Sequence, residues 1–99
     1  MIWHLVRFDF GTVDETVRRE LEADLAALAT IDEVAWLRVG RDVEDPSITG
    51  LMTAFADPEA LDTYRVHPDH IPVVERIRAL GIPVVRLDLH TDDDPEQLP

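Results

Sequence analysis

The order in which strand-like and helix-like apolar patterns follow one another constrains this fold most strongly. Residues 2–10 form an apolar run with β-branched and aromatic side chains that stops at Gly11, which predicts a first strand. Thr12 or Asp14 is a candidate N-cap for the segment that follows. In that segment apolar residues recur at helical spacing: Val17, Leu21, Leu25 and Leu28. A helix is therefore expected directly after the first strand.

Three more strands are expected from short apolar runs that end at turn residues. They cover residues 34–40, 48–56 and 84–90, and a polar loop over residues 41–46 separates the first two. In the last run apolar residues alternate with polar ones, which gives the strand one apolar and one polar face. The apolar set is Val85, Leu87 and Leu89, and the polar set is Arg86, Asp88 and His90.

The second helix is expected in two pieces. Asp57 is a candidate N-cap and Pro58 suits the first helical position, so one piece should start there. Pro68 lacks an N–H and disfavours a helical backbone at the residue before it, so this piece should end near His67. A second piece should begin at Pro68 or at the next residue and end at Gly81. Its apolar residues share one face: Ile71, Val74, Ile77 and Leu80.

The resulting order, βαββαβ, is that of a ferredoxin-like α+β sandwich, in which helices cover one face of a sheet. We expect one domain over residues 1–90 and an acidic flexible tail over residues 91–99. The uncovered face should be apolar, because alternate strand positions carry large apolar residues: Trp3, Leu5, Trp36 and Met52. An exposed apolar sheet face is typical of a protein interface, so we expect a homodimer with two sheets packed face to face, forming a dimeric α/β barrel.

The charge of the chain excludes several classes of partner. Twenty-one acidic residues against nine basic ones give a net charge of −12, which repels nucleic-acid backbones and anionic membrane surfaces. We therefore expect no nucleic acid and no membrane as a partner. Several arginines are scattered among acids, which favours surface ion pairs over an anion site. These arginines are Arg18, Arg19, Arg76 and Arg78.

Missing residue types and motifs narrow the chemistry further. The absence of cysteine excludes disulfides, thiolate catalysis and zinc–cysteine sites. No apolar stretch approaches the ~20 residues needed to cross a bilayer, and no leader-like segment opens the chain. There is no phosphate loop and no dinucleotide motif. We expect a cytoplasmic protein that uses no cofactor and no metal.

The residues best suited to chemistry gather between Tyr64 and His70. This stretch of seven residues holds the only tyrosine and two of the four histidines. Phenol and imidazole are the side chains that exchange protons with an organic ligand near neutral pH. His70 should lie in the first turn of a helix, where the positive end of the helix dipole disfavours an imidazolium. A neutral His70 is therefore expected, and a neutral imidazole can act as a base.

Three segments carry a family resemblance: Met1–Phe8 with its early histidine, Thr53–Tyr64, and His67–His70. Together they resemble the stress-responsive α/β-barrel family, whose members are called Dabb domains. The resemblance extends from Met1 to about His90. It implies the ferredoxin-like fold and a dimeric barrel of two subunits more than it implies a reaction, because many members have no assigned activity.

The same resemblance implies roles for single residues. A plant polyketide cyclase of this family uses a tyrosine and a histidine as the acid–base pair of an intramolecular aldol ring closure, and these fall on Tyr64 and His70. Its strand-one histidine falls on His4, whereas Thr49 stands where the cyclase has another histidine. We therefore expect a pocket for a hydrophobic or aromatic small molecule, with Tyr64 and His70 as the catalytic candidates. The candidates for ligand contact are His4, Val6, Phe8, Thr49 and His67.

Three classes of function remain open: a small-molecule binder, a cyclase-like enzyme, and a structural or stress-associated protein that acts through assembly. An enzyme predicts that Tyr64 and His70 converge on one open pocket. A structural protein predicts that both side chains are hydrogen-bonded internally and that the space is filled. Metal binding by His67, Asp69 and His70 is a further alternative, although their spacing is not a recognised zinc pattern. An oxidative role stays open by analogy with monooxygenases built as dimeric ferredoxin-like barrels.

Overall fold

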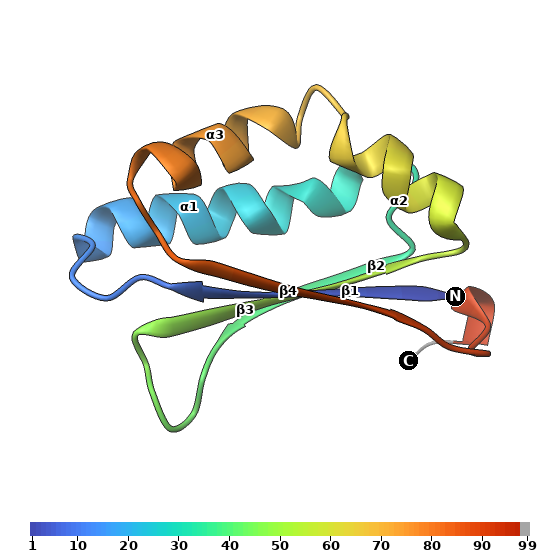
Figure 1. The fold of residues 1–99 in the computed structure, drawn as a ribbon, viewed down its shortest axis with the longest axis horizontal. Helices are drawn as coiled ribbons and strands as arrows, with labels where there is room; N and C mark the ends of the chain where they lie inside the picture. The colour runs from blue at the N-terminus through green and yellow to red at the C-terminus, as the bar shows by residue number, and fades with distance from the viewer. Residues whose placement is uncertain (98–99) are drawn as a thin grey trace.

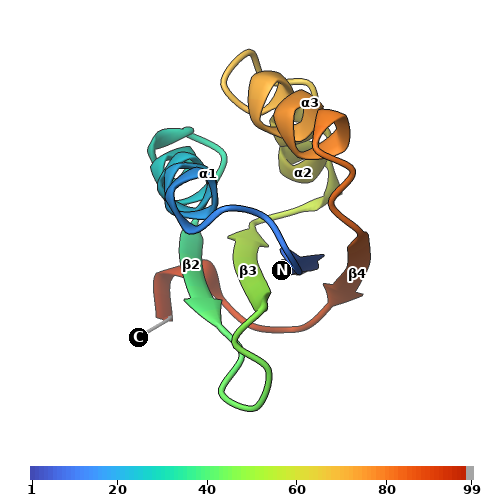
Figure 2. The ribbon, with the colours of Figure 1, turned by 90° about the vertical axis from the view of Figure 1, so that its left-hand side faces the viewer.

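Within residues 1–97, which the computed structural model describes, four strands form one antiparallel sheet in the order β2-β3-β1-β4 (Figure 1). The strands are β1 (Ile2–Asp9), β2 (Trp36–Arg41), β3 (Ile48–Phe55) and β4 (Val84–His90). The helices are α1 (Glu15–Ala27), α2 (Pro58–Arg65) and α3 (Ile71–Ala79), and they lie on one face of the sheet (Figure 2). The expected ferredoxin-like α+β fold is confirmed.

The helices begin where side chains satisfy their first backbone N–H groups. The Asp14 carboxylate accepts the N–H of Thr16 at 2.9 Å, and the Asp57 carboxylate accepts the N–H of Ala60 at 2.8 Å. After α3 the chain turns towards β4 at Gly81, whose φ of +68° favours glycine. Over residues 1–97, no helix has the length and apolar character needed to span a membrane.

Two elements begin later than the sequence predicts. β2 starts at Trp36, because the N–H of Val34 donates to the Ile31 carbonyl at 3.0 Å and forms a turn. α3 is preceded by a second turn, in which the N–H of His70 donates to the His67 carbonyl at 2.9 Å. His70 is therefore the N-cap residue of α3 and lies just outside its first turn.

The core lies between the helices and the side of the sheet that faces them. Val6 and Phe8 on this side of β1 pair in register with Leu51 and Thr49 of β3. Apolar residues of α1, β1 and β3 form one buried cluster, which includes Val6, Phe8, Leu21, Leu25, Leu51 and Phe55. The apolar face predicted for the first helix is therefore the face that packs on the sheet.

β4 is oriented with its polar residues towards the helices. The register pairs Asp88 with His4 and Arg86 with Val6, and both β1 residues are buried on the helix side. The apolar residues of β4 consequently lie on the opposite face of the sheet and are exposed: Val85, Leu87 and Leu89. The alternation expected in this strand is present, but its apolar side faces away from the core.

We call the side of the sheet that faces away from the helices the outer face. The residues expected on it are placed there by the register: Trp3, Leu5, Trp36 and Met52. The rings of Trp3 and Trp36 meet edge to face with centroids 5.5 Å apart. The guanidinium of Arg38 lies 4.7 Å from the centre of the Trp36 ring. The outer face thus carries several large apolar side chains, together with Arg7 of β1 and Arg38 of β2.

The residues after β4 contact one end of the outer face. The Trp3 indole N–H donates to the Asp93 carboxylate at 3.1 Å, and the amino group of Met1 donates to the Thr91 carbonyl at 2.8 Å. A short 3₁₀ turn covers Pro95–Gln97. Residues 98–99 of the expected tail lie outside the described residues.

Candidate functional site

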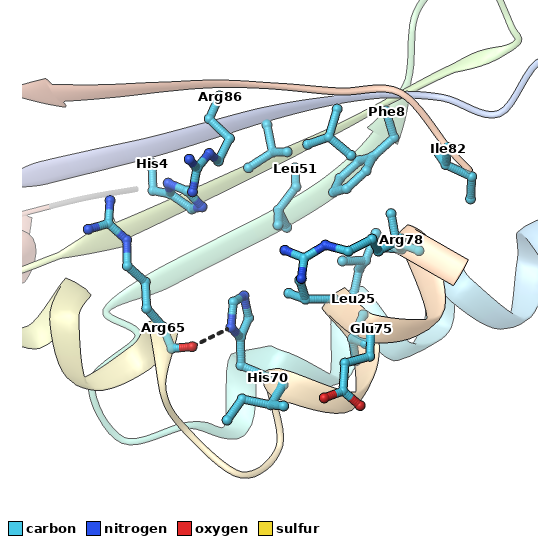
Figure 3. Close-up of a pocket in the computed structure, with 16 residues that line it drawn as sticks. His4, Phe8, Leu25, Leu51, Arg65, His70, Glu75, Arg78, Ile82 and Arg86 are labelled. Atoms are coloured by element: carbon cyan, nitrogen blue, oxygen red, sulfur yellow. Dashed lines mark hydrogen bonds between the residues drawn. The ribbon is translucent and has the colours of Figure 1, made fainter. Parts of the chain in front are cut away.

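An open pocket with a volume of about 610 Å³ lies between α3 and the helix-facing side of the sheet (Figure 3). This volume falls within the range of small-molecule sites. Apolar side chains from β1, β3, α1 and α3 line it, including Val6, Phe8, Leu25, Leu51, Val73 and Ile77. Polar side chains also line it: His4, Arg65, His70, Glu75, Arg78 and Arg86. The pocket therefore combines apolar walls with a few polar groups.

The pocket exists because α3 and β4 leave the space between them unfilled. Of the apolar face expected on α3, Ile77 is buried but Ile71 and Leu80 are exposed, and the helix packs into the core through Val73 and Ile77 instead. On the opposite side, β4 presents Arg86 where an apolar side chain would complete the core. The Arg86 side chain is exposed to water and does not fill this space, so a cavity remains.

His70 lies between α2 and α3 and borders the pocket (Figure 3). Its Nδ1 is 3.1 Å from the Arg65 carbonyl oxygen, which can only accept, so Nδ1 carries a proton and donates. In the neutral ring, Nε2 is then the nitrogen with a free lone pair. Burial lowers the pKa of His70 and outweighs the hydrogen bond to the Arg65 carbonyl, which acts to raise it. The neutral ring agrees with the sequence expectation, although burial is the main cause.

His4 of β1 is buried at the same end of the pocket. Its Nδ1 contacts one carboxylate oxygen of Asp88, and the other oxygen accepts from Arg65 at 3.0 Å. A carboxylate at Nδ1 fixes the orientation of the ring and holds the proton on Nδ1. The Nε2 atom of His4 has no hydrogen-bond partner within residues 1–97.

Tyr64 packs directly against the two histidines. Its ring centroid lies 4.3 Å from that of His70 and 6.2 Å from that of His4. The side chain is 0% exposed, and its hydroxyl has no hydrogen-bond partner within the described residues. Burial raises the pKa of Tyr64, which keeps the group a neutral phenol. Tyr64 and His70 thus come together, but Tyr64 does not line the pocket surface.

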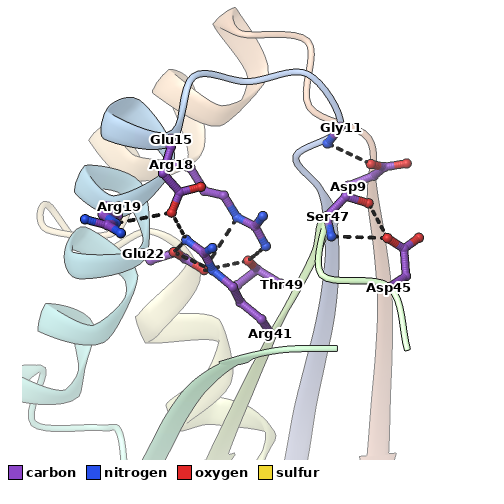
Figure 4. Close-up of polar contacts among 10 residues, drawn as sticks. All are labelled: Asp9, Gly11, Glu15, Arg18, Arg19, Glu22, Arg41, Asp45, Ser47 and Thr49. Carbon is purple, nitrogen blue, oxygen red and sulfur yellow. Dashed lines mark hydrogen bonds and ion pairs between the residues drawn. The ribbon is translucent and has the colours of Figure 1, made fainter. Parts of the chain in front are cut away.

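The other expected ligand-contacting residues divide into two groups. Val6 and Phe8 line the pocket together with His4. Thr49 does not, because its hydroxyl donates to Glu22 at 2.7 Å and accepts from a guanidinium of α1 at 3.0 Å (Figure 4). His67 is also turned away, since its Nδ1 accepts the backbone N–H two residues further on at 3.0 Å.

Thr49 belongs to a polar network between α1 and the sheet (Figure 4). Arg41 of β2 donates to Glu15 and to Glu22 at 2.7 Å each. Arg18 is buried and lies 5.1 Å from the centre of the Phe10 ring, so the expectation of a surface ion pair is wrong for it. Burial acts to raise the pKa of Glu22, but hydrogen bonds from Arg41 and Thr49 outweigh it and the pKa is lowered. The network braces α1 on the sheet.

Sequence reasoning missed the cationic side of the pocket. Arg78 and Arg86 line it, and within residues 1–97 neither forms an ion pair with a carboxylate. The surface ion pair expected for Arg76 is present, with Glu20 at 2.8 Å, but none is found for Arg78 among these residues. The orientation of Arg86 follows from the register between β1 and β4, which the alternation in β4 alone does not reveal.

The geometry gives no support to a metal site. Across residues 1–97, no group of three or more histidine and carboxylate side chains lies close enough to hold an ion. The Nδ1 atoms of His67 and His70 have separate backbone partners, at Asp69 and Arg65. The two rings therefore do not form a pair of ligands through these nitrogens.

Solved structures share this architecture. A Dabb family protein with a ferredoxin-like fold from Mesorhizobium loti is 26% identical, with a TM-score of 0.68 over 91% of this chain and 95% of that chain. SnoaB, a cofactor-independent oxygenase from Streptomyces nogalater, is 13% identical, with a TM-score of 0.75 over 94% of each chain. A dimeric protein of unknown function from Bacteroides fragilis is 15% identical, with a TM-score of 0.70 over 91% of this chain and 95% of that chain.

The sequence also matches a protein family. A search of curated protein sequences found no match. The family model of the stress responsive A/B barrel domain matches residues 2–90, which include all the strands and the three helices described above. The chain therefore belongs to the stress responsive A/B barrel domain family, also called Dabb.

Proposed function

We propose that this protein binds a small hydrophobic or aromatic molecule in the pocket between α3 and the sheet. The observation that carries the proposal is an open apolar cavity of about 610 Å³ that is bordered by His4 and His70. Apolar walls contribute binding through burial, and a few polar groups fix the orientation of the ligand. The Nε2 atom of His70 would accept a hydrogen bond from a ligand hydroxyl or enol, and the Nε2 atom of His4 would form a second hydrogen bond.

We also propose that the protein acts as a homodimer joined through the outer face. Exposed apolar residues of β3 and β4 support this: Met52, Val85, Leu87 and Leu89. The similarity to a Bacteroides fragilis protein described as dimeric is a second support. Packing two such faces would bury these side chains and close the two sheets into a barrel.

A cyclase-like enzyme is the second candidate, and the arrangement of the histidines favours it. His70 is neutral, its Nδ1 is anchored and it borders the pocket, so Nε2 is placed to remove a proton next to a substrate carbonyl. The Tyr64 phenol would stabilise the enolate by donating a hydrogen bond, but it is buried outside the pocket lining, so contact with a substrate requires a local rearrangement. The similarity to SnoaB, a cofactor-independent oxygenase, supports chemistry without a cofactor on this fold.

A tryptophan placed at the mouth of the pocket tests the binding proposal. Aromatic and polyketide-like compounds are screened by thermal shift against the natural chain, Val84→Trp and Val43→Trp. Val84 lines the pocket, whereas Val43 is 97% exposed in the loop between β2 and β3, so the two variants carry the same change inside and outside the site. We expect stabilisation by at least one compound that Val84→Trp abolishes and Val43→Trp preserves.

Two results would count against the proposal. Equal stabilisation of all three proteins would place the ligand outside this pocket. No stabilisation by any compound would favour the assembly role. Compounds that do bind are then incubated with the natural chain and with His70→Gln. Turnover that His70→Gln removes while binding persists would establish the enzyme candidate.

A further inference from the structure

We infer that the ligand of this pocket is an organic acid, with its carboxylate bound by Arg78 and Arg86 and its apolar part against the walls formed by β1 and α3. This inference rests on the proposed function, because it specifies the chemical class of the ligand for the same pocket. It runs against the overall charge of the chain, which is −12 and by itself would repel an anion. The local arrangement of arginines carries the argument.

Arg86 points into the pocket because of the strand register. It pairs with Val6, which faces the core, so its side chain leaves β4 on the helix side of the sheet. Figure 3 shows Arg86 and His4 on the sheet side of the cavity, which both residues line. The neighbouring β4 residue on this side, Asp88, is engaged by His4 and by Arg65. Asp88 is therefore not available to neutralise Arg86.

Arg78 reaches the same space from the opposite wall. It leaves α3 one turn after Glu75, yet the two side chains form no ion pair. Figure 3 shows the Arg78 side chain extending across the pocket towards His70, while the Glu75 carboxylate points away from it. Two guanidinium groups from different elements therefore border one cavity, and each can bind a carboxylate through two parallel N–H···O hydrogen bonds.

Most of the other arginines have partners within the chain. Five of the nine basic residues form ion pairs with acids of the chain: Arg18, Arg19, Arg41, Arg65 and Arg76. Arg38 stacks on Trp36 and donates to a backbone carbonyl. Arg7 of β1 is exposed, does not line the pocket and forms no ion pair among residues 1–97. In a sequence so rich in acids, Arg78 and Arg86 are without a carboxylate partner among residues 1–97, and both lie at the pocket. An acidic ligand would supply that partner.

The apolar walls decide what kind of anion fits. Val6, Phe8, Leu51 and Ile77 line the cavity beside the two guanidinium groups. A compact, fully hydrated ion such as free phosphate would make no use of these walls, whereas an aromatic or alkyl carboxylate would bury its apolar part against them. The expected ligand is therefore an amphipathic carboxylate.

Matched acids and amides provide the test. The natural chain is titrated with 2-naphthoate and 2-naphthamide, and with 4-butylbenzoate and 4-butylbenzamide. Binding is followed by NMR through the chemical shifts of the protein's backbone N–H groups around the pocket. Each pair has the same shape and differs in charge. We expect the acid of at least one pair to bind roughly tenfold more tightly than its amide, as charge-assisted hydrogen bonds from partly exposed arginines would give.

Substitutions test whether the two arginines cause the tighter binding of the acid. In the double variant Arg78→Gln with Arg86→Gln, the acid should bind no better than the amide, and amide binding should be unchanged. Arg76→Gln is the control, because Arg76 lies on the same helix, does not line the pocket and is paired with Glu20. This control should keep the full preference for the acid.

The outcomes separate the two proposals. Equal binding of acid and amide by the natural chain would overturn the inference and leave the proposed binding function intact. A preference for the acid that survives the double substitution would also overturn it, because the charge would then be recognised elsewhere. If neither member of any pair binds in the pocket, the proposed function fails and the inference fails with it.

Discussion

At the scale of single residues, the site consists of two histidines whose protons are fixed by different partners. His70 donates from Nδ1 to a backbone carbonyl only five residues away, at Arg65. His4 is held by Asp88, which is 84 residues away in the sequence. Tyr64 packs against both rings, and its hydroxyl has no partner among residues 1–97. The result is a compact polar group beside an apolar cavity.

Contacts between residues close in the sequence could be predicted, whereas contacts between distant residues could not. Tyr64 and His70 flank a proline break between two helices, so their proximity follows from local chain geometry. The contact between His4 and Asp88 depends on the pairing of the first and last strands, which no local pattern defines. Thr49 was expected to contact the ligand and lies on the expected side of the sheet. It does not line the pocket, because its hydroxyl is hydrogen-bonded to Glu22 and Arg18.

The first prediction concerns the protonation of His70. Its ring signals in an NMR titration should give a pKa below the ordinary value of 6.5, because burial disfavours the imidazolium. The unfolded chain then binds this proton at a higher pH than the folded chain. The free energy of unfolding should therefore fall as the pH drops from above 6.5 through the folded-state pKa.

A comparison with His70→Gln isolates this effect from the titration of the acidic residues. The variant should lose the part of the pH dependence that His70 contributes in this window and keep the rest. A His70 pKa at or above 6.5 would contradict the prediction. It would also weaken the assignment of His70 as a neutral base.

At the scale of helices and strands, two features position the site. α2 ends at Arg65, whose carbonyl and guanidinium anchor His70 and Asp88 respectively. β4 turns its polar side to the helices, which creates the pocket and at the same time exposes its apolar side. The sequence predicted α2 and the alternation in β4, because both are local patterns. It did not predict which side of β4 faces the core, since the sheet register decides this.

The second prediction tests the start of α2. Asp57→Ala removes the carboxylate that accepts the N–H of Ala60, so the free energy of unfolding should fall by about 1 kcal/mol in urea denaturation. Asp57→Asn keeps a side-chain acceptor and should retain most of the stability. An unchanged stability in Asp57→Ala, or an equal loss in both variants, would show that this cap does not stabilise the helix.

At the scale of the whole molecule, the sheet has apolar side chains on both of its faces. One side of the sheet forms the core and the pocket, and the outer face carries the tryptophans and the apolar residues of β4. A chain of 99 residues buries a limited share of its apolar surface alone, so a second copy on the outer face would add substantially to stability. The segment around Asp93 covers only the end of this face near Trp3.

The last prediction concerns this second copy. In sedimentation at micromolar concentration, the natural chain should have twice the mass of one chain, because pairing two outer faces would bury the exposed side chains of Met52, Val85, Leu87 and Leu89. Leu87→Glu should sediment as a monomer, since it places a charge in the centre of β4 on that face. Leu87 is 54% exposed in the single chain, so the substitution does not enter the core, and circular dichroism should show an intact fold. Val43→Glu adds the same charge in a loop and should stay dimeric. A natural chain that sediments as a monomer, or a dimeric Leu87→Glu, would rule out this interface.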